Sequence, residues 1–192
     1  MTDIPYARFQ QALGDIIIKW AVAEEHFRQL LTAVAGLEPL EGEIIFDRVA
    51  AGKQREILML LGKWRHCEAV QGDLAFCARL HAINGANRNL FAHGHIGFGT
   101  MGDQPPKASR IKLQLGNPHH NRMWEIEFSD VLRIADDIQL FDHYARYLAF
   151  AISDDRHKPS RYVGGLHRPN EPIDHSKEWT DLGKICKDEF DF

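Results

Sequence analysis

The sequence predicts a mainly helical protein with a small β-hairpin inserted in its second half. Apolar residues recur every three or four positions in four segments, as they do on the buried face of a helix. Between about residues 95 and 128 they alternate with polar residues instead, which is typical of strands. With 192 residues, 44% of them hydrophobic, the chain can bury a full core. We expect one helical domain over residues 1–153 and a polar, partly ordered arm over residues 154–192.

The first two helices are expected before residue 62. Helical spacing of apolar residues predicts the first over residues 5–35, and Gly36 follows as a typical end signal. The second is expected over residues 44–61, with a break or kink near Ala51-Gly52.

The third helix is expected over residues 73–93. Its weak point is Gly85, because glycine in a helix interior costs about 1 kcal/mol relative to alanine. Gly94 directly follows the last helical residue, His93.

The hairpin and the fourth helix complete the predicted fold. Residues 111–115 and 124–128 alternate between apolar and polar, and Gly116-Asn117-Pro118 opens a turn between them. Ser129 is the expected N-cap of a last helix that ends near Ser153.

Charge is distributed unevenly along the chain. The formal net charge is −4 and the isoelectric point is near 6.2, which argues against a protein coated in basic surface. Between Arg79 and Arg122, however, six basic residues stand against the single acid Asp103. A nucleic-acid site would therefore be a local patch in this segment.

Compartment follows from cysteine usage and hydropathy. The three cysteines form no Cys-x-x-Cys pair and are odd in number, which suits a reducing environment. No run of about 18 apolar residues occurs. We expect a soluble, cytoplasmic protein that does not associate with membranes.

The most informative motif closes the third predicted helix. Arg88 and Asn89 are followed by His93, so a cation, an amide and an imidazole lie within six residues. At about 100° per residue, Asn89 and His93 share one helix face, whereas Arg88 lies about 100° round from Asn89. Either the last turn loosens, or two copies of the helix meet about a dyad and form one cleft.

This motif and the predicted layout resemble the HEPN superfamily over about residues 5–151. The match rests on Arg88-Asn89 with His93 after four intervening residues, and more weakly on Trp20 with Glu24 and Glu25. The resemblance implies an up-down four-helix bundle with the hairpin between helices three and four. It also implies a homodimer whose paired motifs make a composite ribonuclease site.

The predicted activity is metal-independent cleavage of single-stranded RNA, in a toxin, defence or RNA-processing role. The expected catalytic residues are Arg88, which binds the scissile phosphate, Asn89, and His93, which transfers protons. No cofactor is expected. The substrate-binding candidates around them are His81, Asn84, His95, Arg110 and Lys112.

Three other interpretations of these residues remain open. Arg88 could pair with Glu24 or Glu25 and His93 could cap its helix, which would be a purely structural role. The chain could also be a non-catalytic HEPN-like binding subunit, partnered by an antitoxin or a nucleotidyltransferase. Finally, zinc could be held by histidines, namely His93, His95, His119 and His120, together with His66-Cys67 from another loop. No set of acidic residues or cysteines completes such a site.

Overall fold

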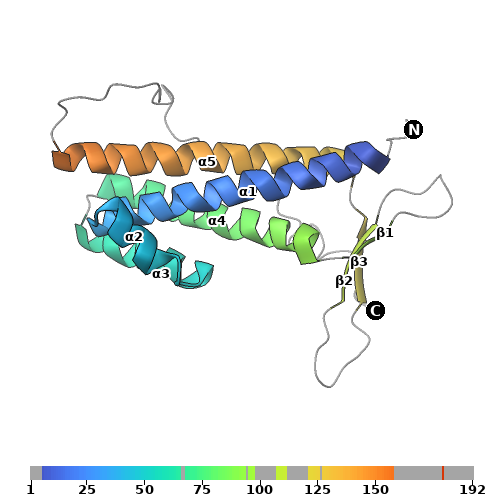
Figure 1. Ribbon diagram of the computed structural model, residues 1–192, viewed down its shortest axis with the longest axis horizontal. Coiled ribbons are helices and arrows are strands. Elements are labelled where there is room, and N and C mark those ends of the chain that lie inside the picture. The colour runs from blue at the N-terminus through green and yellow to red at the C-terminus, as the bar shows by residue number, and fades with distance from the viewer. Residues whose placement is uncertain are drawn as a thin grey trace, which may run out of the picture. The chain divides into compact units, whose positions relative to one another are not determined.

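The computed structural model describes residues 6–65, 68–93, 95–97, 107–111, 121–125 and 127–157, together with Trp179 (Figure 1). The helices within this part of the chain are α1 (Tyr6–Ala35), α2 (Pro39–Phe46), α3 (Ala51–Arg65), α4 (Glu68–His93) and α5 (Phe128–His157). The prediction of a mainly helical protein is confirmed. None of the described helices combines the length and apolar character that crossing a membrane requires.

The chain divides into two compact units, and the three long helices α1, α4 and α5 each contribute to both. Unit 1 comprises Met1–Trp20, Ile83–Ile138 and Trp179–Phe192, and unit 2 comprises Ala21–Ala82 and Gln139–Glu178. Each unit has buried apolar residues of its own: Phe9, Ile16, Val131 and Ile134 in unit 1, and Phe27, Leu58, Leu80 and Phe141 in unit 2.

Helix α1 ends where the sequence predicts. Gly36 adopts a positive φ of 75°, which a residue with a side chain rarely adopts. Its backbone N donates to the carbonyl of Ala33, and the N of Leu37 donates to that of Thr32, both at 3.2 Å. These two bonds form a Schellman motif, which satisfies carbonyls that the end of a helix leaves open.

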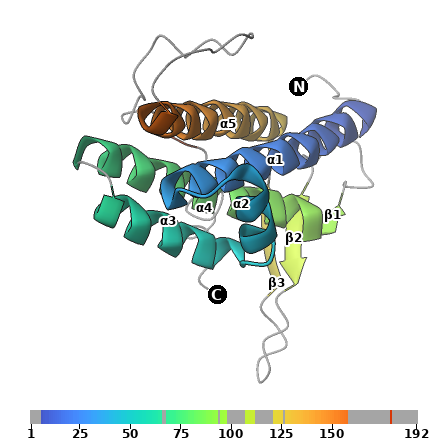
Figure 2. The same ribbon diagram turned by 60° about the vertical axis from the view of Figure 1, so that its left-hand side comes forward.

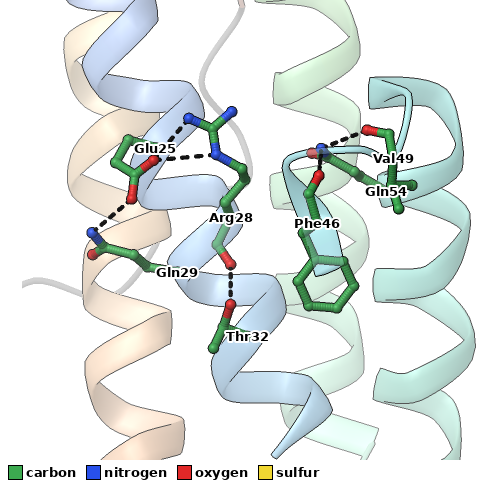
Figure 3. A network of polar contacts seen from close by, with 7 residues as sticks. All are labelled: Glu25, Arg28, Gln29, Thr32, Phe46, Val49 and Gln54. Atoms are coloured by element: carbon green, nitrogen blue, oxygen red, sulfur yellow. Dashed lines mark hydrogen bonds and ion pairs between the residues drawn. The ribbon is translucent and has the colours of Figure 1, made fainter. Parts of the chain in front are cut away.

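The segment predicted as one interrupted helix forms two helices, so the described chain has five helices rather than four. The break lies at residues 47–50, earlier than the expected Ala51-Gly52. Gln54 explains its position: its buried Nε2 donates to the carbonyls of Phe46 at 2.9 Å and of Val49 at 2.8 Å (Figure 3). The amide of α3 thus caps α2 and closes the turn between the two helices (Figure 2).

Replacing Gln54 by leucine is expected to lower the free energy of unfolding by about 2 kcal/mol, because the partly buried Val49 carbonyl loses the donor from Gln54 and the buried Phe46 carbonyl is left with the backbone N of Val49. Urea denaturation measures the change. Gln29→Leu is the matched control, since Gln29 is exposed and bonds only Glu25 in Figure 3; its change should stay within about 0.5 kcal/mol. Equal losses in the two variants would contradict the capping role of Gln54.

Helices α4 and α5 both begin before their expected first residues. Helix α4 starts at Glu68 rather than near Asp73, and ends at His93 as predicted. Helix α5 starts at Phe128, so Ser129 lies inside it and is not the N-cap. Instead the Asp130 carboxylate accepts a bond from the backbone N of Glu127 at 3.4 Å, which assigns the N-cap position to Glu127. Phe128 is held in the helix by its ring contact with Phe9 of α1, at 6.0 Å between centroids in unit 1.

Three short strands form an antiparallel sheet in the order β1-β2-β3. They are β1 (His95–Gly97), β2 (Lys107–Ile111) and β3 (Asn121–Glu125), and only their backbone is described. His95 pairs with Ser109, and Arg110 pairs with Arg122. The sheet follows α4 directly, which keeps β1 next to the end of the helix that carries the motif.

Candidate functional site

The end of α4 in unit 1 has one buried and one exposed face. Asn84 and Asn87 are buried at 0% and 1% exposure, whereas Asn89 and His93 are exposed. Arg88 is half-buried and lies between the two faces. The segment therefore presents an amide and an imidazole to solvent, one turn apart.

Gly85 fixes how closely α4 packs in unit 1. A Cβ atom there would lie 3.2 Å from Cζ2 and 3.3 Å from Cη2 of Trp20, which is itself in the core. The glycine that weakens the helix in isolation thus permits close contact between α4 and the indole of α1. Trp20 is a core residue that supports the segment of the motif.

A hydrogen bond brings Arg88 to the exposed face. Its Nη1 donates to Oδ1 of Asn89 at 3.0 Å, so the long side chain spans the angle of about 100° between the two positions. The guanidinium group is thereby held on the side of the helix where Asn89 and His93 lie. The structure brings Arg88 and Asn89 together without loosening the last turn, since α4 continues to His93.

Two polar groups on the buried side have no hydrogen-bond partner among the described residues. They are the whole side-chain amide of Asn84 and Nε of Arg88. Asn84 and Arg88 are four residues apart and so share a helix face. Each buried, unsatisfied group costs about 1–3 kcal/mol, and in native proteins such groups often mark functional positions.

The structure places His81 in the core of unit 2, with 1% exposure. Its ring stacks on Phe27 at 4.1 Å between centroids, and Arg55 Nη1 lies 3.1 Å from its Nδ1. Burial above all, and then the charges of Arg55 and Arg28, lower the pKa of His81 to about 3. The ring is closed off from solvent, so His81 is a core residue and not part of an open groove.

The remaining predicted residues are only partly described. His95 lies in β1 and Arg110 in β2, where the backbone alone is placed, and Lys112 lies outside the described residues. His66, Cys67, His119 and His120 of the alternative zinc site also lie outside them. Among the described side chains, no group of three histidine, cysteine or acidic residues is arranged to hold a metal ion.

Sequence reasoning missed a partly buried pair in unit 2. Nδ1 of His26 on α1 contacts Oδ1 of Asp142 on α5, and Arg146 lies 3.9 Å from the other carboxylate oxygen. His26 and Asp142 are 116 positions apart, and no local pattern in the sequence joins them.

Glu25 of α1 has partners other than Arg88. Glu25 accepts bonds from Arg28 at 2.7 Å and from Gln29 at 3.3 Å (Figure 3). The bond from Arg28 is the main reason that the pKa of Glu25 is lowered. The pairing of Arg88 with Glu25, considered from the sequence, is therefore replaced by the bond between Arg88 and Asn89.

Comparisons with protein-family models, with curated proteins and with solved structures found no match to the chain. The assignment of a function consequently depends on the geometry at the end of α4.

Proposed function

We propose that the chain is a metal-independent endoribonuclease that cleaves single-stranded RNA at the end of α4. The observation that carries the proposal is the hydrogen bond between Arg88 and Asn89, which holds a guanidinium group on the face that exposes His93. A fixed cation beside an accessible imidazole is what phosphodiester cleavage without a metal needs. We take the four longer helices α1, α3, α4 and α5 as a HEPN-like four-helix bundle with an inserted β-hairpin, α2 as a short addition to it, and the site as shared by two copies.

In this mechanism one His93 accepts the proton of a ribose 2′-OH as that oxygen attacks the adjacent phosphorus. The bond between phosphorus and the 5′ oxygen breaks, and His93 of the second copy protonates the departing oxygen. The products are a 2′,3′-cyclic phosphate and a free 5′-OH, so atoms and protons balance. Arg88 binds the phosphoryl oxygens, whose negative charge grows in the transition state.

The unsatisfied groups behind Arg88 support a functional interpretation. A fold optimised only for stability would fill the position of Asn84 with an apolar residue, because its buried amide has no partner among the described residues. Asn84 lies one turn before Arg88 on the same face. An amide that is unpaired among the described residues, next to the proposed phosphate-binding arginine, therefore supports a functional role for this end of α4.

The proposed ribonuclease acts in the cytoplasm and binds RNA and a controlling protein. The basic stretch from Arg79 to Arg122 would attract RNA, with Arg110 and Lys112 among its charges. A cytoplasmic ribonuclease of this kind would need control, and an antitoxin or a nucleotidyltransferase is the class of partner that its HEPN resemblance implies. No cofactor is required.

The experiment is cleavage of labelled single-stranded RNA by the purified full chain in EDTA. The wild type should release fragments that carry a 2′,3′-cyclic phosphate, and an all-DNA strand should stay intact because it lacks the 2′-OH. His93→Ala and Arg88→Ala should each slow cleavage about 100-fold.

Two substitutions on exposed helix surfaces serve as matched controls. His143→Ala removes an exposed imidazole of α5, and Arg133→Ala removes an exposed guanidinium group that pairs with Asp130. Both should cleave at the wild-type rate. Equal cleavage by His93→Ala and the wild type would remove His93 from the mechanism, and an inactive wild type that still binds RNA would favour the non-catalytic subunit.

A further inference from the structure

Large apolar side chains are exposed on two successive helices of unit 2. On α2 and α3 they number six within 25 residues: Leu40, Ile44, Ile45, Met59, Leu60 and Trp64. Single exposed apolar residues are ordinary, but a dense group on one part of a soluble protein marks an interaction surface.

On α2 the exposed side chains form a stripe that faces away from the core. Gly42 and Phe46 are the buried residues of this helix. At about 100° per residue, the edge formed by Leu40 and Ile44 points about 160° away from them. These two residues are 68% and 61% exposed, so the stripe takes no part in the core of its own unit.

Acidic residues border this stripe on both sides. Glu41 directly follows Leu40 in the sequence, and Glu43 directly precedes Ile44. At about 100° per residue they lie on opposite sides of the edge formed by Leu40 and Ile44, and both are exposed. The Glu41 carboxylate accepts a bond from the backbone N of Glu38 at 3.1 Å and so is partly engaged. Glu43 forms no ion pair with any described residue, and its charge is available to a second molecule.

A complementary hollow lies between α3 and α4 in unit 2. It has a volume of about 210 Å³ and is lined by Met59, Leu60, Gly62, Lys63, Gln71 and Leu74. Gly62 lets α3 approach Leu74 of α4 closely beside the hollow, because a Cβ atom there would meet Cδ1 of Leu74 at 2.6 Å. Among the described residues of this lining, Lys63 is the one with a formal charge; it is exposed and forms no ion pair with a described residue.

We propose that the stripe on α2 of one copy docks into the hollow between α3 and α4 of a second copy. Leu40 and Ile44 are spaced as i and i+4 anchors, the pattern by which an amphipathic helix fills an apolar groove. Glu43 of one copy then pairs with Lys63 of the other. Because each copy carries both halves, two equal contacts related by a dyad close a dimer.

A second copy is the occupant because the two halves match in apolar character and in charge within one chain. The stripe is apolar with acidic borders, and the hollow is apolar with a basic rim. Gly42 and Phe46 hold the other edge of α2 in the core, so the stripe is presented to another molecule. The contact uses unit 2 alone and does not depend on the ribonuclease proposal.

Sedimentation equilibrium of the full chain tests this contact with a charge exchange. Glu43→Lys and Lys63→Glu should each weaken self-association at least about tenfold, because each places like charges opposite one another. The double variant should restore association to near the wild-type constant. Lys53→Glu, an exposed charge on the same α3 outside the hollow, should leave it unchanged.

An apolar pair of variants gives an independent readout. Ile44→Asp should weaken the association at least as strongly as Glu43→Lys, whereas Ile18→Asp, at a residue of α1 that is 66% exposed and outside the contact, should not. Far-ultraviolet circular dichroism verifies that both variants fold. A monomeric wild type, or an association constant that neither Glu43→Lys nor Ile44→Asp lowers, overturns the proposal. Failure of the double variant to restore binding overturns the pairing of Glu43 with Lys63.

Discussion

Replacing Gly42 by alanine is expected to lower the free energy of unfolding by about 3 kcal/mol. The added Cβ atom would lie 2.0 Å from Oγ1, 2.3 Å from Cγ2 and 2.6 Å from Cβ of Thr32. Thr32 cannot turn aside, because it is buried and its hydroxyl donates to the carbonyl of Arg28 at 2.9 Å (Figure 3). Helix α2 must therefore move away from α1, and the buried contacts of Phe46 loosen with it.

The comparison with other glycines makes this prediction specific. Gly14→Ala adds a methyl group on an exposed face of α1 with no atom of the described residues within 4 Å, so it should stabilise the protein by up to about 1 kcal/mol. Thr32→Ala removes the two nearest atoms, and in the double variant it should recover part of the loss. If Gly42→Ala and Gly14→Ala shift the urea midpoint alike, α2 does not pack against Thr32 as described.

Local patterns predicted the helices wherever one helix face explains the residues. The apolar spacing of α1 and its end at Gly36 follow from positions close in sequence, and the positive φ of Gly36 is the reason for that end. The end of α4 at His93 was predicted in the same way. A helix terminus is a local event, so its signal lies within a few residues.

The parts that were not predicted depend on contacts between distant segments. The break before α3 is fixed by the side chain of Gln54, whose polar character gave no sign that it would be buried. Helix α5 begins at Phe128, whose ring contacts Phe9 at the other end of the chain. Patterns within a short stretch of sequence carry no information on contacts between residues so far apart.

At the candidate site, too, the position of each residue on its helix was predicted, whereas the contacts of its side chain were not. Sequence placed Arg88, Asn89 and His93 at the end of a helix, and helical geometry alone gave the angle between them. It could not show that the Arg88 side chain reaches Asn89, or that Asn84 is buried without a partner among the described residues. His81 looked like a neighbour of the motif, yet Phe27 and Phe141 enclose its ring in unit 2.

That enclosure of His81 is expected to make the protein unstable in acid. Its pKa is lowered to about 3 in the folded state, from the ordinary 6.5, because burial and the nearby charges of Arg55 and Arg28 disfavour the imidazolium. Between these two pH values the unfolded chain binds the proton and the folded chain does not. The stabilisation is therefore complete above pH 6.5 and is lost as the pH falls toward 3.

The expected loss from this one group is roughly 2 kcal/mol between pH 7 and pH 5, and about 4 kcal/mol by pH 3. Urea denaturation at pH 7, 6 and 5 measures it, in a range where most carboxylates stay ionised. His81→Asn keeps an acceptor near the position of Nδ1 for Arg55 but cannot titrate, so its stability should change much less over the same range.

His143→Asn distinguishes His81 from histidines in general, because His143 is exposed and its loss should leave the pH dependence of the wild type intact. The comparison depends on slopes and not on absolute stability, so a packing defect that lowers the His81→Asn curve uniformly does not affect it. If the curves of the wild type and of His81→Asn run parallel from pH 7 to pH 5, His81 is protonated as easily in the folded protein as in the unfolded chain. The stacked and buried ring described in unit 2 would then be incorrect, since no imidazolium can lie between Phe27, Phe141 and a guanidinium group without a large loss of stability.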